Sequence, residues 1–329
     1  MRPMLVAELS GNHLGSLDRA LKIAAAAARS GADALKLQTW EPSMMVLDRG
    51  YRIQAGPWAG RNLYDLYEAV HTPKEWHKPI FDCCAELGIE CFSSAFDRPS
   101  VDFLETLNVK RHKVASFELV DLDLIRHASD TGKPLILSTG MATQQEIDEA
   151  ELAAESVNDL TMLRCVSGYP SQPEEAGLDL MVKLRHLHFC KVGLSDHTLT
   201  DTTAIAATAL GASMIEKHFT LSRAQGGPDA AFSLEPEEFR RMANVVRETA
   251  AACDPDAKFG PNESEKAQVH LRRSLWWSRD LPAGHIIQAA DLVTARPALG
   301  LPPNWKPQLI GRTLNRAAKA GTPVQAICT

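Results

Sequence analysis

The sequence lacks three features that would take the protein out of the ordinary soluble class. No apolar run reaches the roughly 20 residues that a transmembrane helix needs. The start, MRPMLVAELSGNH, has no long apolar stretch with a small-residue cleavage site, so it does not read as a secretory signal. The net charge of −6 offers no general basic surface for nucleic acid or an anionic membrane. We therefore expect a cytoplasmic protein without nucleic-acid or membrane partners.

Zinc-type cysteine spacing is also missing. The seven cysteines are scattered along the chain, and Cys83 and Cys84 are adjacent. An odd, scattered set does not suit a disulfide framework and is typical of a reducing compartment. The 329 residues, 45% hydrophobic and 23% charged, suit a globular protein of one large domain or two modest ones.

Short apolar runs alternate with amphipathic segments over the first three quarters of the chain. The first helical segment follows Ser16, a suitable N-cap, and stops at Gly31. Strict alternation predicts parallel strands joined by right-handed crossovers. Eight such units in about 250 residues predict a closed (β/α)8 TIM barrel, with an open doubly wound sheet as the alternative. The predicted strands are 4–9, 32–38, 89–94, 112–117, 134–139, 161–166, 190–195 and 213–219.

The pattern changes after Cys253. Residues 256–269 are polar and rich in turn formers, which predicts a linker. Residues 270–329 hold short strand-like pieces separated by Gly and Pro, which predicts a small, mostly β domain. A domain of that size has a marginal core, so we expect it to pack on something larger. The predicted division is therefore a barrel over 1–255, the linker, and the small domain.

Polar side chains gather where the predicted strands end, and TIM barrels build their active sites there. His197 and His218 follow successive strands, and two imidazoles with nearby carboxylates suit a divalent transition metal. Glu8 and Glu216 are carboxylates suited to proton transfer. The cations and small donors, which suit a phosphate or carboxylate group, are Lys36, Lys113, Ser94, Ser116, Ser138, Ser167 and Ser195.

Plainer interpretations exist for the same residues. A strand-end histidine is usually a satisfied polar group, so the pair leaves open both a metal site and two ordinary polar side chains. Serines at such positions often cap the next helix. Lys36 and Lys113 fit a plain interpretation less well, because an unpaired buried cation is costly. Each lysine should therefore meet an anion, either a protein carboxylate or a ligand.

Several stretches together resemble the sialic acid synthase family, in order along essentially the whole chain. They include AELSGNHLGSLDRALKIAAAAARSGADALKLQT, CFSSAFD, HKVASFEL, GKPLILSTGM, GLSDHT and IEKHFT. The tail, DLPAGHIIQAADLVTARPALGLPP, is similar to that family's C-terminal antifreeze-like (SAF) domain. Within the family, AGRNLYDLYEAVHTPKEWHKPIF and GGPDAAFSLEPEEF resemble the pseudaminic acid synthases more than the N-acetylneuraminate synthases.

The resemblance implies a transferase that condenses phosphoenolpyruvate with an N-acetylated amino sugar. In the pseudaminate branch the sugar is 2,4-diacetamido-2,4,6-trideoxy-β-L-altropyranose; N-acetylneuraminate and legionaminate synthases use other sugars with the same chemistry. It implies that His197 and His218 hold a divalent cation that polarises the sugar aldehyde, usually Mn²⁺, with Co²⁺ and Mg²⁺ as alternatives. Glu8 is then the candidate acid and base.

The resemblance also implies substrate contacts. The two lysines and five serines match the phosphoenolpyruvate site, and Gln38, Tyr169, Glu216 and Asp229 match positions around the sugar. Arg296 matches an arginine that the SAF domain inserts into the neighbouring subunit's site, which implies a domain-swapped homodimer. Family members commonly carry extra residues before the first strand. We therefore expect either a different cover for the barrel floor or a start that lies upstream.

Two other classes of function stay open. A barrel aldolase with a Schiff base at Lys113 or Lys36 would leave the two tip histidines unexplained. A non-catalytic carbohydrate-binding protein using the SAF domain would not need Glu8, both histidines and both lysines together.

Overall fold

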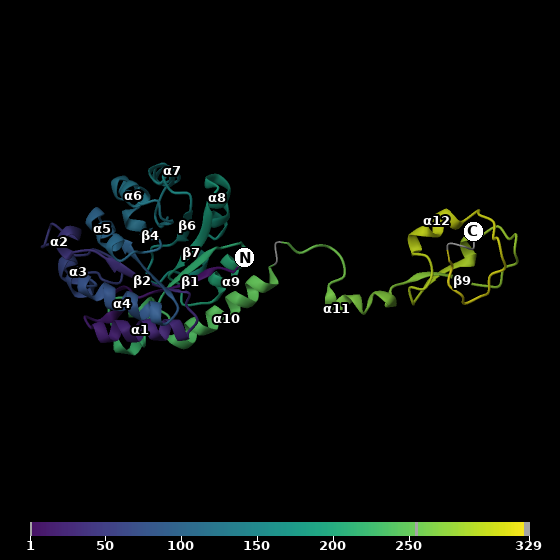
Figure 1. The fold of residues 1–329 in the computed structure, drawn as a ribbon, viewed down its shortest axis with the longest axis horizontal. Helices are drawn as coiled ribbons and strands as arrows, with labels where there is room; N and C mark the ends of the chain where they lie inside the picture. The colour runs from purple at the N-terminus through teal and green to yellow at the C-terminus, as the bar shows by residue number, and fades with distance from the viewer. Residues whose placement is uncertain (1, 254–255, 326–329) are drawn as a thin grey trace. The chain divides into compact units, whose positions relative to one another are not determined.

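The computed structural model describes residues 2–253 and 256–325. The chain divides into two compact units, Met1–Pro255 and Asp256–Thr329, and Figure 1 colours them purple to green and green to yellow. No helix within the described ranges is long and apolar enough to cross a membrane.

The first unit is a closed barrel of eight parallel strands in sequential order, which confirms the predicted TIM barrel (Figure 1). In the register of this barrel, Glu8 lies beside Lys36 on one neighbouring strand and beside His218 on the other. The strands are β1 (Met4–Glu8), β2 (Ala34–Thr39), β3 (Glu90–Ala95), β4 (His112–Val114), β5 (Leu135–Ser138), β6 (Leu160–Cys165), β7 (Lys191–Asp196) and β8 (Met214–His218).

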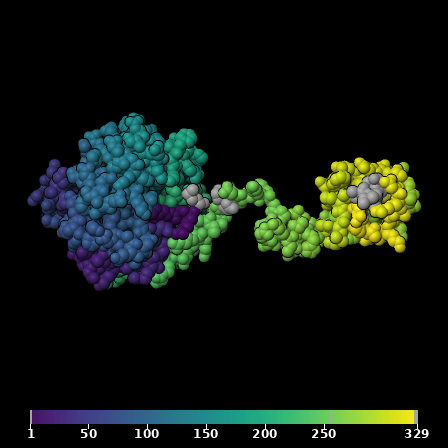
Figure 2. Space-filling view, viewed as in Figure 1, coloured from purple at the N-terminus to yellow at the C-terminus, as the bar shows by residue number. Residues whose placement is uncertain are grey.

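Helices surround the strands, and the blue and teal helical segments form much of the barrel surface seen in Figure 2. The predicted first N-cap is confirmed, because the Ser16 side chain accepts a hydrogen bond from Arg19 N. Gly31, just past that helix, has a φ of +89°, a conformation that favours glycine. The main helices are α1 (Leu17–Arg29), α4 (Lys74–Glu86), α5 (Arg98–Thr106), α6 (Leu122–Ser129), α7 (Gln144–Ala153), α8 (Asp179–His188), α9 (Thr202–Ala209) and α10 (Pro236–Ala252).

An apolar layer fills the barrel interior below the strand tips. Because side chains alternate along a strand, the residue two positions after an inward apolar residue also points inward. Val6 is thus followed by Glu8, Ala34 by Lys36, and Met214 by Glu216. The layer consists of Val6, Ala34, Phe92, Ile136, Leu163 and Met214. The packed layer puts the polar residues on an apolar floor at the carboxyl ends of the strands.

One local prediction was wrong. The fourth strand was expected to reach Phe117, but it ends at Val114, and Ser116–Glu118 form a 3-10 turn. The Ser116 hydroxyl in this turn accepts a hydrogen bond from Gly140 N. The connection from β2 to α4 is long. It contains α2 (Pro42–Met45) and α3 (Leu63–Val70), which begin at Pro42 and at the N-cap Asn62.

The second unit has a small core of its own around a two-stranded antiparallel sheet of β9 (Ser274–Trp277) and β10 (Leu292–Ala295). Isolated bridges add short β contacts, among them Leu281 with Ala318. Two short helices, α11 (Glu263–Lys266) and α12 (Lys306–Leu309), complete it. The first of these lies within the stretch that the sequence predicted to be a linker.

Candidate active site

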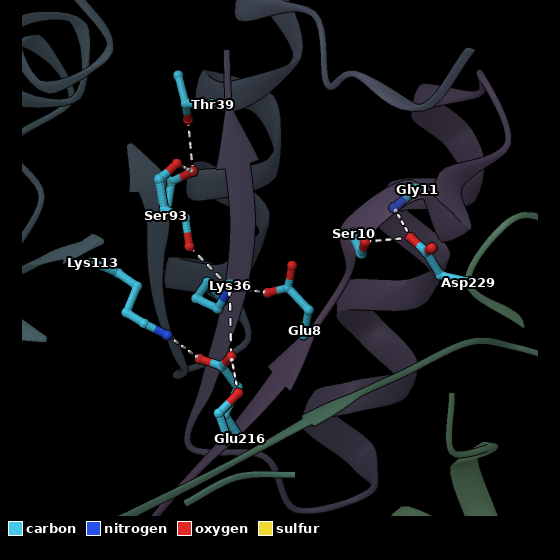
Figure 3. Close-up of polar contacts among 11 residues, drawn as sticks. Glu8, Ser10, Gly11, Lys36, Thr39, Ser93, Lys113, Glu216 and Asp229 are labelled. Atoms are coloured by element: carbon cyan, nitrogen blue, oxygen red, sulfur yellow. Dashed lines mark hydrogen bonds and ion pairs between the residues drawn. The ribbon is translucent and has the colours of Figure 1, made fainter. Parts of the chain in front are cut away.

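Four charged side chains converge inside the barrel mouth, from β1, β2, β4 and β8 (Figure 3). Lys36 Nζ lies 2.7 Å from Glu8 Oε2 and 3.7 Å from Glu216 Oε1. Lys113 Nζ lies 3.4 Å from Glu216 Oε2. All four residues are buried. Each predicted buried lysine therefore meets a protein carboxylate.

The two carboxylates of this cluster have pKa values that are pushed apart. Burial has the largest influence on Glu8 and raises its pKa to about 7, although Lys36 opposes it. Burial would also raise the pKa of Glu216, but Lys113 and Lys36 outweigh it and lower the pKa to about 2. Glu216 is therefore ionised at neutral pH. Glu8 is near its midpoint, where a group can either give or take a proton.

The pKa values of the two lysines are also shifted in opposite directions. Burial would lower the pKa of Lys36, but Glu216 and Glu8 outweigh burial and raise it. Burial lowers the pKa of Lys113, and the single carboxylate of Glu216 only partly offsets it. Within the described chain, neither carboxylate oxygen of Glu8 accepts a hydrogen bond of good geometry. The cluster is neutral when fully ionised, yet Glu8 retains unused acceptor capacity.

Two of the predicted serines contact this cluster. Lys36 Nζ donates to Ser94 Oγ at 3.0 Å, and Ser195 Oγ donates to Glu216 Oε1 at 3.1 Å. The tips of β5 and β6 bring the others together around Gly140. A Cβ on Gly140 would lie 2.3 Å from Ser167 Oγ and 2.7 Å from Ser116 Oγ, so only glycine fits there. The buried Ser138 hydroxyl has no hydrogen-bond partner among the described residues.

Helix capping does not explain these serines. Asp97 caps α5, Asp121 caps α6 and Thr143 caps α7, each by accepting a backbone N–H. The capping interpretation is therefore wrong for Ser94, Ser116 and Ser138, the serines on the strands or turns before those helices. Their hydroxyl groups remain available at the barrel mouth.

His197 and His218 lie together, with ring centroids 5.3 Å apart. His197 Nδ1 is 2.7 Å from the Val166 carbonyl oxygen, so Nδ1 carries the proton and Nε2 keeps its lone pair. His218 Nδ1 is buried without a hydrogen-bond partner in the described ranges. Burial lowers the pKa of both rings, that of His218 well below its usual value. Neutral imidazoles with a free lone pair are what a transition metal binds.

A cation fits this pair of histidines. The chemistry of the donors is right, and the second ring nitrogen of His197 is held by a carbonyl as in known metal sites. No group of three or more His, Cys, Asp or Glu side chains in residues 2–253 and 256–325 converges on one point. A cation held by the two imidazoles would therefore take its remaining ligands from water or substrate.

A cavity of about 400 Å³ opens beside His218. Three other residues assigned to the sugar site, Gln38, Tyr169 and Asp229, also line it, whereas Glu216 does not. Burial is the largest influence on Asp229 and raises its pKa. Its Oδ2 accepts hydrogen bonds from the Ser10 hydroxyl and from Gly11 N (Figure 3). This carboxylate thereby ties the segment after β8 to the segment after β1.

The wall of this cavity was missed in the sequence. Aromatic and aliphatic side chains dominate it, and many come from residues 40–70 between β2 and α4. The signal was present as a run of Trp, Tyr and Leu in a connection longer than a simple crossover needs. The aromatic residues of the wall include Trp40, Trp58, Tyr67, Phe96, Phe117 and Phe232.

Arg296 lies in the second unit, just past β10, and is exposed. It makes no hydrogen bond or ion pair with the residues that the structure describes. The barrel unit by itself therefore assembles every predicted site residue except this one.

Fold and site together define a TIM-barrel protein with interacting lysines and carboxylates at the carboxyl ends of its strands, followed by a small second unit. Residues 23–258 match the NeuB family and residues 272–326 match the SAF domain. The chain belongs to the NeuB family.

Relatives and solved structures agree with this assignment. The chain is 41% identical to the pseudaminic acid synthase of Helicobacter pylori, over 98% of this chain and 97% of that protein. It is 33% identical to the N,N'-diacetyllegionaminic acid synthase of Legionella pneumophila, over 98% and 93%. The crystal structure of N-acetylneuraminic acid synthetase from Leptospira borgpetersenii, in complex with citrate, superposes with a TM-score of 0.74 at 26% identity, covering 82% of this chain and 90% of that one.

Proposed function

We propose that the protein is a pseudaminic acid synthase, a transferase that joins phosphoenolpyruvate to 2,4-diacetamido-2,4,6-trideoxy-β-L-altropyranose and releases phosphate. The observation that carries the proposal is a buried cluster of lysines and carboxylates at the barrel mouth together with a mostly apolar cavity beside His218. Lys36 and Lys113 lie at the barrel mouth, and the cavity beside His218 suits a sugar with several methyl groups. The identity to the Helicobacter synthase over almost the whole chain supports the same assignment.

The phosphate and carboxylate groups of phosphoenolpyruvate would bind the lysines together with the serines at the tips of β3 to β7. An anion arriving there makes it harder for Glu8 to stay ionised, because like charges raise the pKa of a carboxyl group. Glu8 would therefore take up a proton as the substrate binds. Glu216, held ionised by both lysines, would keep them charged and in place.

In the reaction, C3 of phosphoenolpyruvate bonds to the aldehyde carbon of the open-chain sugar. Water adds at C2, and the C–O bond to phosphate then breaks, leaving the keto acid and inorganic phosphate. Glu8 is the group that would move the proton at the C2 centre, since its carboxylate is buried, lies beside Lys36 and is near its midpoint at neutral pH. Asp229, Gln38 and Tyr169 would orient the sugar from the cavity wall.

We include a divalent cation in this proposal, with Mn²⁺ favoured and Co²⁺ or Mg²⁺ as alternatives. His197 and His218 would hold it, and their neutral, unprotonated ring nitrogens support that role. When bound, the cation would supply Lewis-acid polarisation of the sugar aldehyde. We place the reaction in the cytoplasm, where phosphoenolpyruvate is available.

We also propose that the active assembly is a domain-swapped homodimer. Arg296 is exposed in the SAF unit, and its guanidinium suits a carboxylate or an acetamido carbonyl. Exposed apolar side chains at the barrel mouth, Phe117, Val120 and Met141, support a covering partner there. Mixing Arg296→Ala with Glu8→Ala protein should restore part of the activity, because some mixed dimers contain one intact site. Verified mixed dimers with no recovered activity would refute the swap.

A phosphate-release assay tests the proposed function directly. Purified protein receives phosphoenolpyruvate, Mn²⁺ and one of three sugars: the diacetamido-trideoxy-altrose, N-acetylmannosamine or the legionaminic acid precursor. Mass spectrometry then identifies the acid. Release with the altrose sugar alone is the expected result, whereas release only with another sugar would assign the chain to a different nonulosonate synthase. No release, with metal bound, would favour the carbohydrate-binding function, and borohydride trapping of a lysine–sugar adduct would indicate the aldolase.

A further inference from the structure

Residues 48–62 form a hairpin-like segment whose hydrogen bonds are nearly all local. Gly60 N donates to Ile53 O at 2.8 Å, closing the segment on itself. Within the described chain, a single hydrogen bond joins it to any part of the protein beyond α3. In that bond Trp58 Nε1 donates to the Pro228 carbonyl oxygen at 3.1 Å. Trp58 is thus the point at which the segment is attached over the barrel.

The Trp58 ring continues the aromatic wall that leads to the two histidines. Its centroid lies 5.6 Å from that of Tyr169 and 6.1 Å from that of Phe232. The Tyr169 ring in turn lies 4.3 Å from the His197 ring and 6.1 Å from the His218 ring. Trp58 is only partly buried and lines the cavity, so part of its ring is available to a ligand.

Few polar groups are available in this cavity. Ser10, Gln38, Asp229 and His218 contribute polar atoms, and Ser10 and Asp229 already bond to each other. The other polar atoms belong to the edges of the aromatic rings: the hydroxyls of Tyr51, Tyr67 and Tyr169 and Nε1 of Trp40 and Trp58. A sugar hydroxyl placed against the face of an aromatic ring, such as that of Trp58, would lose its hydrogen bonds to water without replacement. A methyl group in the same place would gain contact instead. The wall therefore suits a sugar that carries deoxy and acetamido positions where other sugars carry hydroxyl groups.

We propose that Trp58 is a specificity-determining residue, whose ring contacts the methyl groups of the diacetamido-trideoxy sugar while its Nε1 holds the 48–62 segment in place. The proposal rests on the proposed function, which supplies the sugar. It assigns Trp58 a part in sugar binding and none in binding phosphoenolpyruvate.

Steady-state kinetics of three variants test this proposal in the full-length protein. Trp58→Ala removes the ring, Trp58→Phe keeps an aromatic face but loses the bond to Pro228, and Gln54→Ala changes the same segment outside the cavity. Trp58→Ala should raise the KM for the altrose sugar by about 10- to 100-fold, the usual scale for one apolar contact in a pocket. Its KM for phosphoenolpyruvate and its melting temperature should stay near wild type.

The control variants decide how the result is interpreted. Trp58→Phe should recover most of the sugar affinity, and Gln54→Ala should behave like wild type. An unchanged KM for the sugar in Trp58→Ala, or a loss confined to kcat or shared equally by both substrates, would overturn the proposal. Because the wild-type enzyme is assayed in parallel, its failure to use the altrose sugar would instead refute the proposed function.

Discussion

Glu216 and Lys217 are consecutive residues of β8, and they belong to two different buried clusters of charged side chains. On the helix side of the strand, Lys217 Nζ lies 2.7 Å from Asp196 Oδ2 and donates to the carbonyl oxygens of Thr198 at 2.6 Å and Thr200 at 3.1 Å. Asp196 also accepts a hydrogen bond from Thr198 N at 2.9 Å. On the barrel side, Glu216 joins two lysines and Glu8.

The difference lies in how completely each cluster is satisfied. Lys217 and Asp196 use their hydrogen-bonding capacity on the protein itself, so they have little left for a ligand. Glu8 is equally buried and forms an ion pair with Lys36, but neither of its oxygens accepts a well-aligned hydrogen bond within the described chain. Unsatisfied buried polar groups are costly and rare in folded proteins. The comparison teaches that a buried charge does not by itself identify a ligand-binding site. A buried charge that still has hydrogen-bonding positions free for a ligand is the better indicator.

The strongest test of the barrel side is His218→Ala. Activity with Mn²⁺ should fall by roughly 10³-fold, because Lewis-acid assistance is worth several kcal/mol. The free energy of unfolding, measured in urea, should fall only by the packing that the buried ring makes with His197 and Phe232, since His218 Nδ1 has no described hydrogen-bond partner to lose. Full activity of this variant, after EDTA treatment and Mn²⁺ repletion, would refute the metal assignment.

Lys217→Met tests the other side of the strand. Removing one partner of a buried ion pair costs about 3–5 kcal/mol, so the urea midpoint should drop sharply. The double variant Asp196→Ala/Lys217→Met should regain part of the loss, because no unpaired charge is left buried. If the single variant were as stable as wild type, the satisfied cluster would have no structural role and the comparison would fail.

Much of the barrel side was predictable from the sequence. Parallel strands bring their carboxyl ends to one mouth, so Glu8, Lys36, Lys113 and Glu216 could be grouped before their geometry was known. Which carboxylate pairs with which lysine depends on strand register and on the radius of the closed barrel. Spacing along the chain does not encode either quantity.

The cavity wall was much less predictable. Trp58 acquires its place through a bond to Pro228, a contact between residues 170 positions apart. Local patterns carry no trace of such a contact. The N-cap at Asn62 and the proline at Pro42 could have located α3 and α2 but not the face that each presents. Arg296 could be proposed only from the family resemblance, because nothing in its own spacing along the chain links it to the barrel mouth.

The pH dependence of stability sharpens the comparison through Glu8. Its pKa is raised from 4.5 to about 7 in the folded protein, so between these values the folded state binds more protons than the unfolded state. The contribution of Glu8 to stability should therefore fall as pH rises from about 4.5 to about 7. Glu8→Gln should remove this contribution from the melting-temperature profile. Because glutamine cannot transfer a proton in the same way, the substitution should also lower activity by about 10²–10⁴-fold. An equally steep profile in Glu8→Gln would show that another group is responsible.

Asp291, in the second unit, is a buried carboxylate whose oxygens both accept hydrogen bonds. We expect the effect of pH on stability through Asp291 to be the smallest of the predicted effects and opposite in sign to that of Glu8. Gln288 N, His285 Nε2 and Arg279 Nε each lie 2.8 Å from its oxygens. Burial alone would raise its pKa, but these donors outweigh burial and lower it from 3.8 to about 2. Its contribution to stability is present above about 3.8 and is lost as pH falls towards about 2. Asp291→Asn should remove the loss of stability that Asp291 causes at acid pH. Unfolding of the SAF unit can be measured by tryptophan fluorescence. The dependence of stability on pH that Glu8 causes between about 4.5 and about 7 should stay unchanged. A variant that altered both dependences on pH would mean that the satisfied and unsatisfied carboxylates do not titrate independently.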